Sequence, residues 1–358
     1  MIFETILSLF LSAVTPQSAT LVFAGDAMQH QRQLEVARIG KNEYDYNVCF
    51  ADIAPWVSEA DYAVVNLETP LGDSNFTGYP CFNAPMKYAE ALKTAGFDLF
   101  LTANNHTLDR RDAGLKRTIA LLDSLEVDHI GTYVNSTARD TLIPLVKDVN
   151  GFKIGFLNYT YGTNGIGIQG DVVVDMIDRD RIVKDIAKTR KAGAELVAVA
   201  IHWGIEYVAL PPATVRNLAD FLCEQDVDMV IGGHPHVVQP MEMRRNATTG
   251  RNVLLVYSMG NLISNMKTRD TRGGAMVKVY LERDSAGTAF VNNAEYMPHF
   301  TVPPVTAKDN FRVVLLPEDN VVDSVIPQLW RQNARAWLKS AIPLFDRHNV
   351  GVDRVKGY

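Results

Sequence analysis

The chain has 358 residues, of which 47% are hydrophobic and 21% charged, and its formal net charge at pH 7 is -6. This composition excludes a disordered chain, and the length is enough for a large buried core. The absence of a Lys/Arg-rich run excludes an extended nucleic-acid surface, so a small molecule or a polymer end is the expected partner.

The N-terminal segment predicts export. An apolar stretch over residues 6–14 precedes the small residues Ser18 and Ala19, as in a signal peptide and its cleavage site, although Glu4 stands where a signal peptide carries Lys or Arg. We expect a signal peptide at residues 1–19 and a periplasmic or cell-surface protein, with a membrane anchor or a buried N-terminal helix as alternatives.

Short apolar strands then alternate with helical patterns, which predicts an α/β layered architecture. Strands are expected at 20–24, 62–65, 97–101, 128–130, 142–146, 152–157, 195–201, 228–231, 253–257 and 275–281. Helices are expected at 47–59, 86–95, 112–125, 182–192, 213–224 and 323–342. Asn150-Gly151 predicts a hairpin between two of the strands.

The three cysteines have no metal-type spacing. Cys223 lies in a helical pattern and is expected in the core. A disulfide between Cys49 and Cys81 is conceivable only in an oxidising compartment.

Five predicted strands end in polar residues that can bind a divalent ion. These ends are Gly25-Asp26, Asn66-Leu67-Glu68, Asn104-Asn105-His106, His202-Trp203-Gly204 and His234-Pro235-His236, and a sixth is Ser258-Met259-Gly260-Asn261. In open α/β sheets the functional crevice lies outside the carboxyl ends of the strands. Nitrogen and oxygen donors of this kind suit Mn²⁺, Zn²⁺ or Fe²⁺, so the pattern predicts a site for one or two divalent ions.

Each residue taken alone also has a structural explanation. Asp26 could cap a helix, and Asn104 and Asn105 could form turns. Glu68 could be solvated, and His202 could be a hydrogen-bonded core histidine. The recurrence of polar residues at successive strand ends favours the metal site. The remaining histidines lack such neighbours and are expected to be structural: His30, His129, His299 and His348.

Seven stretches between Ala24 and Ser264 carry a resemblance to a known family. In order they read AGDAM, VVNLETPL, FTGYPCFNAP, TANNHTLDR, AIHWGIEY, GGHPHVVQP and YSMGNLIS. They resemble the capsule-synthesis CapA (poly-gamma-glutamate synthesis) family, which is similar to the calcineurin-like metallophosphoesterase superfamily. The resemblance implies an αββα two-sheet sandwich at residues 20–283. A small α+β extension with strands and a long amphipathic helix would follow at 284–358.

The resemblance also implies a ligand set. It assigns Asp26 to a first metal, Glu68 to the place of the superfamily's bridging Asp, Asn105, His202 and His234 to a second metal, and His236 to the first. The sequence departs from the superfamily at Met28, which occupies the histidine position of the Asp-x-His motif. The first metal would have fewer protein ligands, which leaves a mononuclear or weakly occupied site open.

His106 matches the superfamily's acid that protonates the leaving group. Asp109 is expected to orient His106, and Arg110 to pair with an anionic substrate group. Further candidates beside the ligands or in contact with substrate are Asn104, Glu206, Tyr207 and Asn261. Helix capping or surface solvation would explain Asp109, Arg110, Glu206 and Tyr207 almost as well.

Three functions follow from the resemblance, all in the synthesis of a capsule or a related anionic polymer. The first is a metal-dependent phosphoesterase, in which the ions lower the pKa of bound water and polarise a phosphoryl or carbonyl oxygen. The second is a non-hydrolytic accessory protein that binds metal or anionic polymer within an envelope polymer-synthesis complex. The third is an amide-bond hydrolase or transferase that acts on poly-gamma-glutamate.

Overall fold

The computed structural model describes residues 17–356 and 358. The expected signal peptide therefore lies outside the described residues except for its last three positions. The first strand, β1, begins at Ser18. Within the described part of the chain, no helix is long and apolar enough to cross a membrane.

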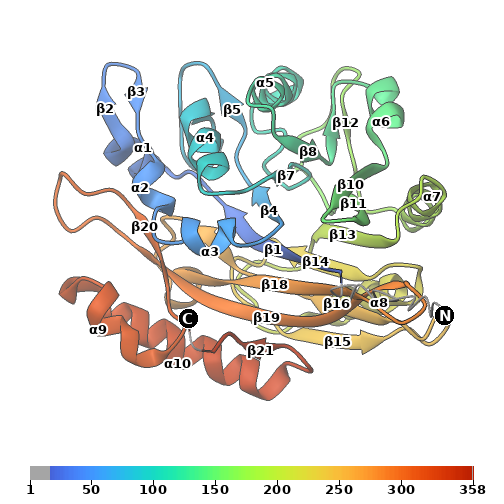
Figure 1. Cartoon of the computed structure of the whole chain (residues 1–358). Helices are drawn as coiled ribbons and strands as arrows, with labels where there is room; N and C mark the ends of the chain where they lie inside the picture. The colour runs from blue at the N-terminus through green and yellow to red at the C-terminus, as the bar shows by residue number, and fades with distance from the viewer. Residues whose placement is uncertain (1–16, 357) are drawn as a thin grey trace, which may run out of the picture.

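Two β-sheets stack face to face, with helices on their outer faces (Figure 1), which confirms the predicted αββα two-sheet sandwich. The first sheet has the order β20-β19-β18-β1-β4-β7-β8, with β17 paired to β1 and β21 to β19. Its strands are β1 (Ser18–Ala27), β4 (Tyr62–Leu67), β7 (Leu99–Leu101), β8 (Asp128–Ile130), β17 (Asn261–Ile263), β18 (Gly273–Arg283), β19 (Ala289–Val302), β20 (Arg312–Leu315) and β21 (Asp353–Arg354). Strands β1, β4, β7 and β8 run parallel to one another, whereas β18, β19 and β20 add antiparallel pairs.

The second sheet has the order β10-β11-β13-β14-β16-β15 and is parallel from β11 to β16. Its strands are β10 (Leu145–Val149), β11 (Phe152–Thr160), β13 (Leu196–His202), β14 (Met229–Gly233), β15 (Met241–Arg245) and β16 (Asn252–Val256). The hairpin predicted at Asn150-Gly151 joins β10 to β11. Smaller two-stranded pairs are β2 (Arg38–Gly40) with β3 (Glu43–Tyr44), β5 (Leu71–Gly72) with β6 (Ala84–Pro85), and β9 (Thr132–Tyr133) with β12 (Val173–Val174).

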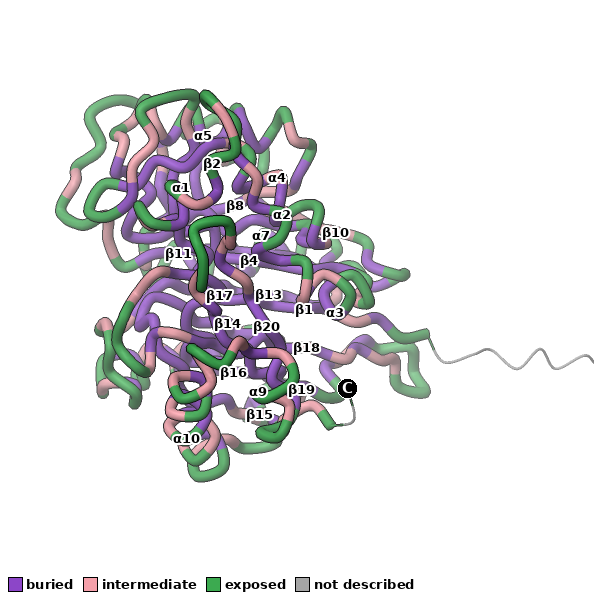
Figure 2. Tube along the Cα trace, turned by 90° about the vertical axis from the view of Figure 1, so that its left-hand side faces the viewer, coloured by how far each residue is buried: buried purple, intermediate pink, exposed green. Residues whose placement is uncertain are grey.

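The core follows from the alternation of side chains along the strands. In β1, Leu21 and Phe23 pack in one cluster with the second sheet. Val22 and Ala24 pack on the other face with helices α2 (Asn47–Phe50), α3 (Ala54–Ser58) and α4 (Met86–Thr94). Buried segments accordingly fill the middle of the molecule and exposed segments lie at its periphery (Figure 2). The helices are α1 (Gln31–Ala37), α2 (Asn47–Phe50), α3 (Ala54–Ser58), α4 (Met86–Thr94), α5 (Arg111–Ser124), α6 (Ser136–Leu142), α7 (Arg179–Lys191), α8 (Ala213–Glu224), α9 (Val322–Val325) and α10 (Arg331–His348).

Two helix predictions differ from the structure because of prolines. The helix expected at 47–59 is divided into α2 and α3, and Pro55 lies in the first turn of α3. Proline lacks a backbone N–H and favours the start of a helix over its interior. The helix expected at 323–342 is replaced by the short α9 and by α10, which starts after Pro327 and continues through Pro343 to His348.

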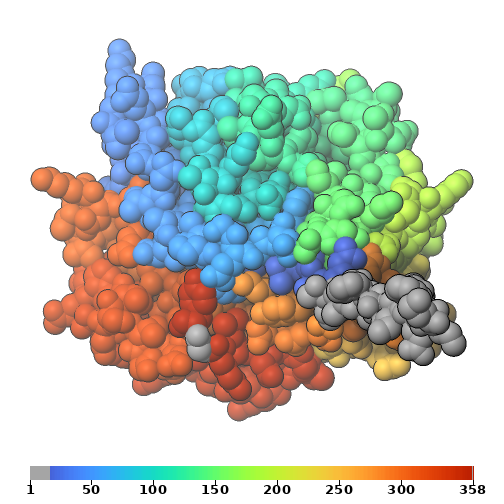
Figure 3. Space-filling model, viewed as in Figure 1, coloured from blue at the N-terminus to red at the C-terminus, as the bar shows by residue number. Residues whose placement is uncertain are grey.

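Residues after 283 complete the first sheet. Strand β19 pairs with β18 over most of its length, and α10 packs on β19, where the ring centroids of Tyr296 and Phe345 are 4.4 Å apart. In the space-filling view this C-terminal part, orange to red, covers the lower part of the molecule (Figure 3). Cys49, Cys81 and Cys223 are all free, so the disulfide considered for Cys49 and Cys81 is not formed.

Candidate metal centre

The six ligands implied by the motifs lie together at the carboxyl ends of strands from both sheets. Asp26 lies in β1, Glu68 directly follows β4, Asn105 follows β7, His202 ends β13, and His234 and His236 follow β14. All six are at least nine-tenths buried. The edge where parallel strands end is therefore the place where the two sheets contribute side chains to one site.

Asp26, Glu68 and His236 form a first group, whose candidate ligand atoms all lie within 4.8 Å of one another. His236 Nδ1 is 3.3 Å from Asp26 Oδ2, and His236 Nε2 is 3.7 Å from Glu68 Oε1. These residues are the ones assigned to the first metal.

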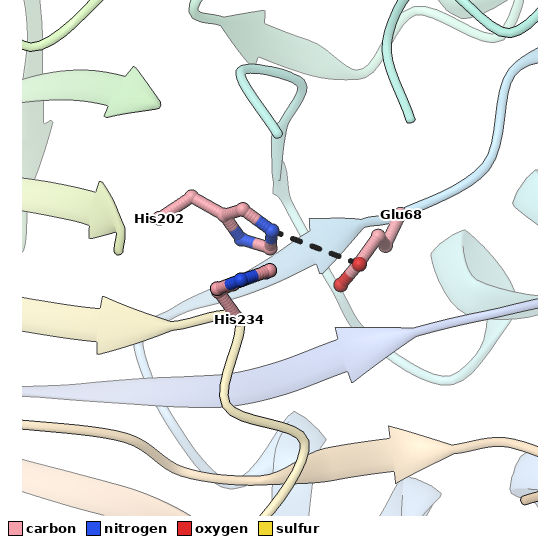
Figure 4. Close-up of side chains that lie close together, drawn as sticks. All are labelled: Glu68, His202 and His234. Atoms are coloured by element: carbon pink, nitrogen blue, oxygen red, sulfur yellow. Dashed lines mark ion pairs between the residues drawn. The ribbon is translucent and has the colours of Figure 1, made fainter. Parts of the chain in front are cut away.

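Glu68, His202 and His234 form a second group within the same limit. His202 Nε2 is 3.6 Å from Glu68 Oε1, as Figure 4 shows, and the rings of His202 and His234 are 4.8 Å apart. Asn105 joins this group, because its Oδ1 lies 3.0 Å from His202 Nε2. The Nδ2 of Asn105 donates to Asn164 Oδ1 at 3.2 Å, which turns its oxygen toward His202. Glu68 belongs to both groups, as a bridging carboxylate would.

Asn261 fixes the proton of His236. The Nδ2 of Asn261 donates to Ser264 Oγ and to the carbonyl oxygen of Thr271, at 3.1 and 2.9 Å. Its Oδ1 therefore faces His236 Nδ1, 2.9 Å away, and can only accept. His236 must carry its proton on Nδ1, which leaves the lone pair of Nε2 directed toward Glu68.

The segment that carries the two histidines has a strained backbone. His234 has a φ of +99° and His236 a φ of +58°, values that residues with a Cβ seldom adopt. A Cβ at Gly233 would lie only 2.9 Å from Asp26 Oδ1, so glycine is needed for β14 to approach β1. The backbone N–H of His234 donates to Asp26 Oδ2 at 3.2 Å. Strain of this kind persists where the surroundings impose it, and it is concentrated at functional sites.

The pKa values of the two carboxyl groups of the site are shifted in opposite directions. Burial opposes ionisation of Asp26, but the hydrogen bond and charge of His236 outweigh it and hold the pKa of Asp26 well below its usual range. Burial and the negative charge of Asp26 raise the pKa of Glu68 well above its usual range. These surroundings therefore disfavour the ionised form of Glu68. A bound divalent ion would compensate its negative charge instead.

His202 and His234 favour the neutral form that can bind a metal ion. Burial lowers the pKa of His202 well below its usual value, and the neighbouring His234 and His236 add to this effect. Burial, followed by the charge of His236, lowers the pKa of His234 to about 4. A metal ligand must be the neutral imidazole, so the site favours the required form.

Two buried atoms show that the residues present fit a divalent ion. Glu68 Oε1 and His234 Nδ1 have no hydrogen-bond partner, and each belongs to a residue of the second group. Buried polar atoms are seldom left without a partner. Histidine nitrogen and carboxylate oxygen together match Zn²⁺, Mn²⁺ or Fe²⁺.

The predicted acid and its partner lie beside this cluster. His106 Nδ1 is 2.8 Å from Asp109 Oδ2, which also accepts from the backbone N–H of Phe82 at 2.8 Å. Asn104 is buried and donates to the carbonyl oxygen of Leu67, next to Glu68. Arg110 forms no hydrogen bond or ion pair with the cluster within the described part of the chain, and it precedes α5.

Glu206 and Tyr207 also reach the site. A carboxylate oxygen of Glu206 forms a third group with His234 and His236. The ring of Tyr207 is 6.1 Å from that of His236. Tyr207 is exposed, so it lies at the open side of the centre.

Two contributors were not among the predicted site residues. Asn66 Nδ2 donates to Asp26 Oδ1 at 2.8 Å and to Glu68 Oε2 at 3.3 Å, and so connects the two carboxyl groups. Tyr161 directly follows β11, and its ring lies 4.5 Å from that of His234. Asn66 and Tyr161 both lie near the end of a strand, like the predicted ligands. Tyr161 would have been predicted if the strand expected at 152–157 had been extended to Thr160, where β11 ends.

Comparisons with known proteins show the family to which the chain belongs. A family model described as bacterial capsule synthesis protein PGA_cap matches residues 20–266. Capsule biosynthesis protein CapA of Bacillus anthracis is 27% identical over 287 residues, which cover 77% of this chain and 66% of that protein. PGA biosynthesis protein CapA of Bacillus subtilis (strain 168) is 27% identical over 271 residues, which cover 74% of this chain and 68% of that protein. The matched region thus spans only about two thirds of the length of these relatives.

Among solved structures, NAD nucleotidase (NadN) of Haemophilus influenzae aligns with a TM-score of 0.50 and 11% identity, over 94% of this chain and 57% of that one. This likeness concerns the fold alone. The family model, in contrast, covers well over half of the chain and includes every residue of the three groups. The chain therefore belongs to the bacterial capsule synthesis protein PGA_cap family, the CapA family that its motifs resemble.

Proposed function

We propose that the protein is a metal-dependent hydrolase of phosphoesterase type that takes part in the synthesis of a capsule or a related anionic polymer at the cell envelope. The proposal rests on one observation. Ligands from two sheets converge on one buried site in which Glu68 Oε1 and His234 Nδ1 have no protein partner. The family membership supports the role in capsule synthesis.

The residues of the two groups would hold one or two divalent ions. Such ions, when bound, polarise a phosphoryl or carbonyl oxygen and make water more acidic. Asn261 keeps Nε2 of His236 free of a proton, and Asn66 keeps the carboxyl groups of Asp26 and Glu68 in place. The protein thus supplies a pre-organised set of donors, which need not rearrange when substrate arrives.

His106 would protonate the leaving oxygen. Its Nδ1 is held by Asp109, so Nε2 is the nitrogen that would deliver the proton. Asp109 itself is fixed by the N–H of Phe82, and the rings of Phe82 and His106 are in edge contact at 4.6 Å. These contacts limit the ring to one orientation, as a general acid requires.

Metal analysis of the purified protein, together with assays on model phosphomonoesters and phosphodiesters and on poly-gamma-glutamate, tests the proposal. We expect at least one bound divalent ion and turnover of a phosphoester. His106→Ala should keep the metal and lower kcat by roughly 10²–10⁴-fold. His348→Ala, at the end of α10, serves as the control and should change neither the bound metal nor kcat. A protein that binds no divalent ion and hydrolyses nothing would rule the proposal out.

A second candidate is the non-hydrolytic accessory protein, and Met28 is the observation that favours it. Its side chain is buried, and its backbone oxygen accepts from Gln33 and Tyr88, so no ligand stands where the superfamily has histidine. This function predicts that cells carrying His106→Ala still make capsule, whereas cells without the protein do not. Shortening of poly-gamma-glutamate in the assay would instead favour an amide-bond hydrolase.

A further inference from the structure

Glu206 lies beside His234 and His236, outside the first and second groups of candidate ligands. It is half-buried in the loop between β13 and α8, four residues after His202. One of its carboxylate oxygens is within 4.8 Å of a ring nitrogen of both His234 and His236. The motif-based assignment gave Glu206 only a supporting role, yet no other carboxylate of the described chain forms a group with both of these histidines.

The loop around Glu206 is fastened on both sides to the segment that carries the histidines. The backbone N–H of Trp203 donates to the carbonyl oxygen of Gly233 at 3.1 Å, and that of Tyr207 to Pro235 at 2.8 Å. The buried Gln239 adds a third bond, from its Nε2 to the carbonyl oxygen of Val208 at 2.6 Å. These bonds fix Glu206 relative to His234 and His236, so its proximity does not depend on a free surface loop.

The charges at the site leave Glu206 without a protein cation. The ion-pair contacts of Asp26 and Glu68 involve only histidines. Over the described residues, Glu206 forms no ion pair with Lys or Arg. A half-buried carboxylate that lies beside ring nitrogens of two histidines and has no Lys or Arg partner is stabilised by a divalent cation, and His234 Nδ1, which has no partner, belongs to a residue of the same group.

The first group alone offers three residues, Asp26, Glu68 and His236, whereas zinc sites use four donors and octahedral ions more. We propose that Glu206 is a direct metal ligand that acts with His236 and supplies the donor that Met28 lacks. This inference rests on the proposed metal dependence of the protein. It adds one residue to the ligand set and predicts that the first position is filled.

Titration calorimetry of the metal-free full-length protein with Mn²⁺ and with Zn²⁺ tests this role. We expect Glu206→Gln to lower the affinity of one bound ion by at least about 10-fold, or to remove one equivalent, because a donor and a charge are lost. Glu224→Gln, an exposed residue at the end of α8, should leave binding unchanged. Thermal unfolding of the metal-free variants should be unaltered, which separates ligation from folding.

A second variant tests whether the loss of a metal donor explains the lower affinity of Glu206→Gln. Met28→His in the Glu206→Gln background restores a donor at the first position, so part of the lost affinity should return. If Glu206→Gln binds both metals as tightly as the wild type, Glu206 is not a ligand, and the proposed hydrolase still stands. If only kcat falls while binding is unchanged, Glu206 acts on protons and the inference is overturned. If the wild-type protein binds no metal, the inference and the proposed function both fail.

Discussion

Asn261 shows how a residue outside the proposed ligand set can determine the proton position of a proposed ligand, His236. Its amide group donates to Thr271 and Ser264, and this orientation forces the proton of His236 onto Nδ1. Partners of this kind are as important to a metal site as its ligands, because they fix the tautomer and the orientation of the ring.

We therefore expect Asn261→Leu, which keeps the size of the side chain, to lower metal affinity by roughly 10–100-fold. The loss should be visible by calorimetry in the variant even where its secondary structure is unchanged. Asn292→Leu, at an exposed position of β19, is the control and should bind metal normally. Unchanged affinity in Asn261→Leu would mean that another group determines the tautomer of His236.

His299 predicts a pH dependence of stability that is separate from the metal centre. It is buried in β19, neither ring nitrogen has a hydrogen-bond partner, and burial lowers its pKa to about 3. In the unfolded chain the pKa of histidine is about 6.5, so between these values the unfolded state binds the extra proton. The free energy of unfolding therefore falls as the pH drops through this window.

The contribution of His299 is measured against His299→Leu, which cannot titrate. Between pH 7 and pH 5 the wild type should lose about 2 kcal/mol more free energy of unfolding than the variant. Urea denaturation at both pH values, with metal-free protein, gives this difference. Equal losses in the two proteins would show that His299 is protonated, or solvated, in the folded state.

The sequence could predict which side chains gather at the candidate site because each stands in a motif at the end of an apolar strand. Asn66 was harder to identify, since its role depends on the parallel register that brings Asn66 of β4 opposite Asp26 of β1. Tyr161 was missed because β11 continues to Thr160, past the apolar run that predicted it. Local pattern gives the residue type, whereas the pairing of strands decides which side chains meet.

At the level of elements, strand β14 is packed so closely that a single methyl group has no room. A Cβ at Gly232 would lie 2.1 Å from the carbonyl oxygen of Tyr257 and 2.6 Å from Trp203 Nε1. These two atoms are themselves joined by a hydrogen bond of 2.9 Å. The close contact holds β14 against the end of β16 and so positions His234.

Gly232→Ala should therefore lower the free energy of unfolding by roughly 1–3 kcal/mol, because the added methyl must move backbone atoms. Gly167→Ala, in an exposed loop with open space around it, is the matched control and should have little effect. Denaturant titrations of both variants give the comparison. Equal stabilities would mean that the ends of β14 and β16 can separate at no cost.

Helices and strands were predictable to different degrees for physical reasons. Helices α4, α5, α7 and α8 follow the apolar spacing of the sequence closely. Strand β15 was not predicted, since its residues are mostly half-buried and mixed in polarity. The long helix was placed too early because helical spacing alone does not show where Pro327 ends one segment and allows the next to begin.

For the whole molecule, the C-terminal strands support the strand that carries Asp26. Strand β18 pairs with β1 from Ser18 to Phe23, and β19 then covers the other edge of β18. The family match ends at residue 266, before β18 begins. The sequence motifs thus contain the residues of the candidate metal centre, while the sheet that holds these residues extends well beyond the motifs. A pairing between segments so far apart in the chain leaves no local signal.

This arrangement predicts that a chain ending at Arg283 does not fold. Without β19 and α10, the inward side chains Val277 and Val279 of β18 lose their cover, and β18 becomes a long apolar edge that favours aggregation. Circular dichroism and limited proteolysis should show no cooperative unfolding transition and rapid cleavage. A chain ending at Arg354 keeps β21 and α10, and it should unfold cooperatively like the full chain. If the shorter chain instead unfolds cooperatively and binds metal, residues after 283 form a separate addition, and the metal centre is complete without them.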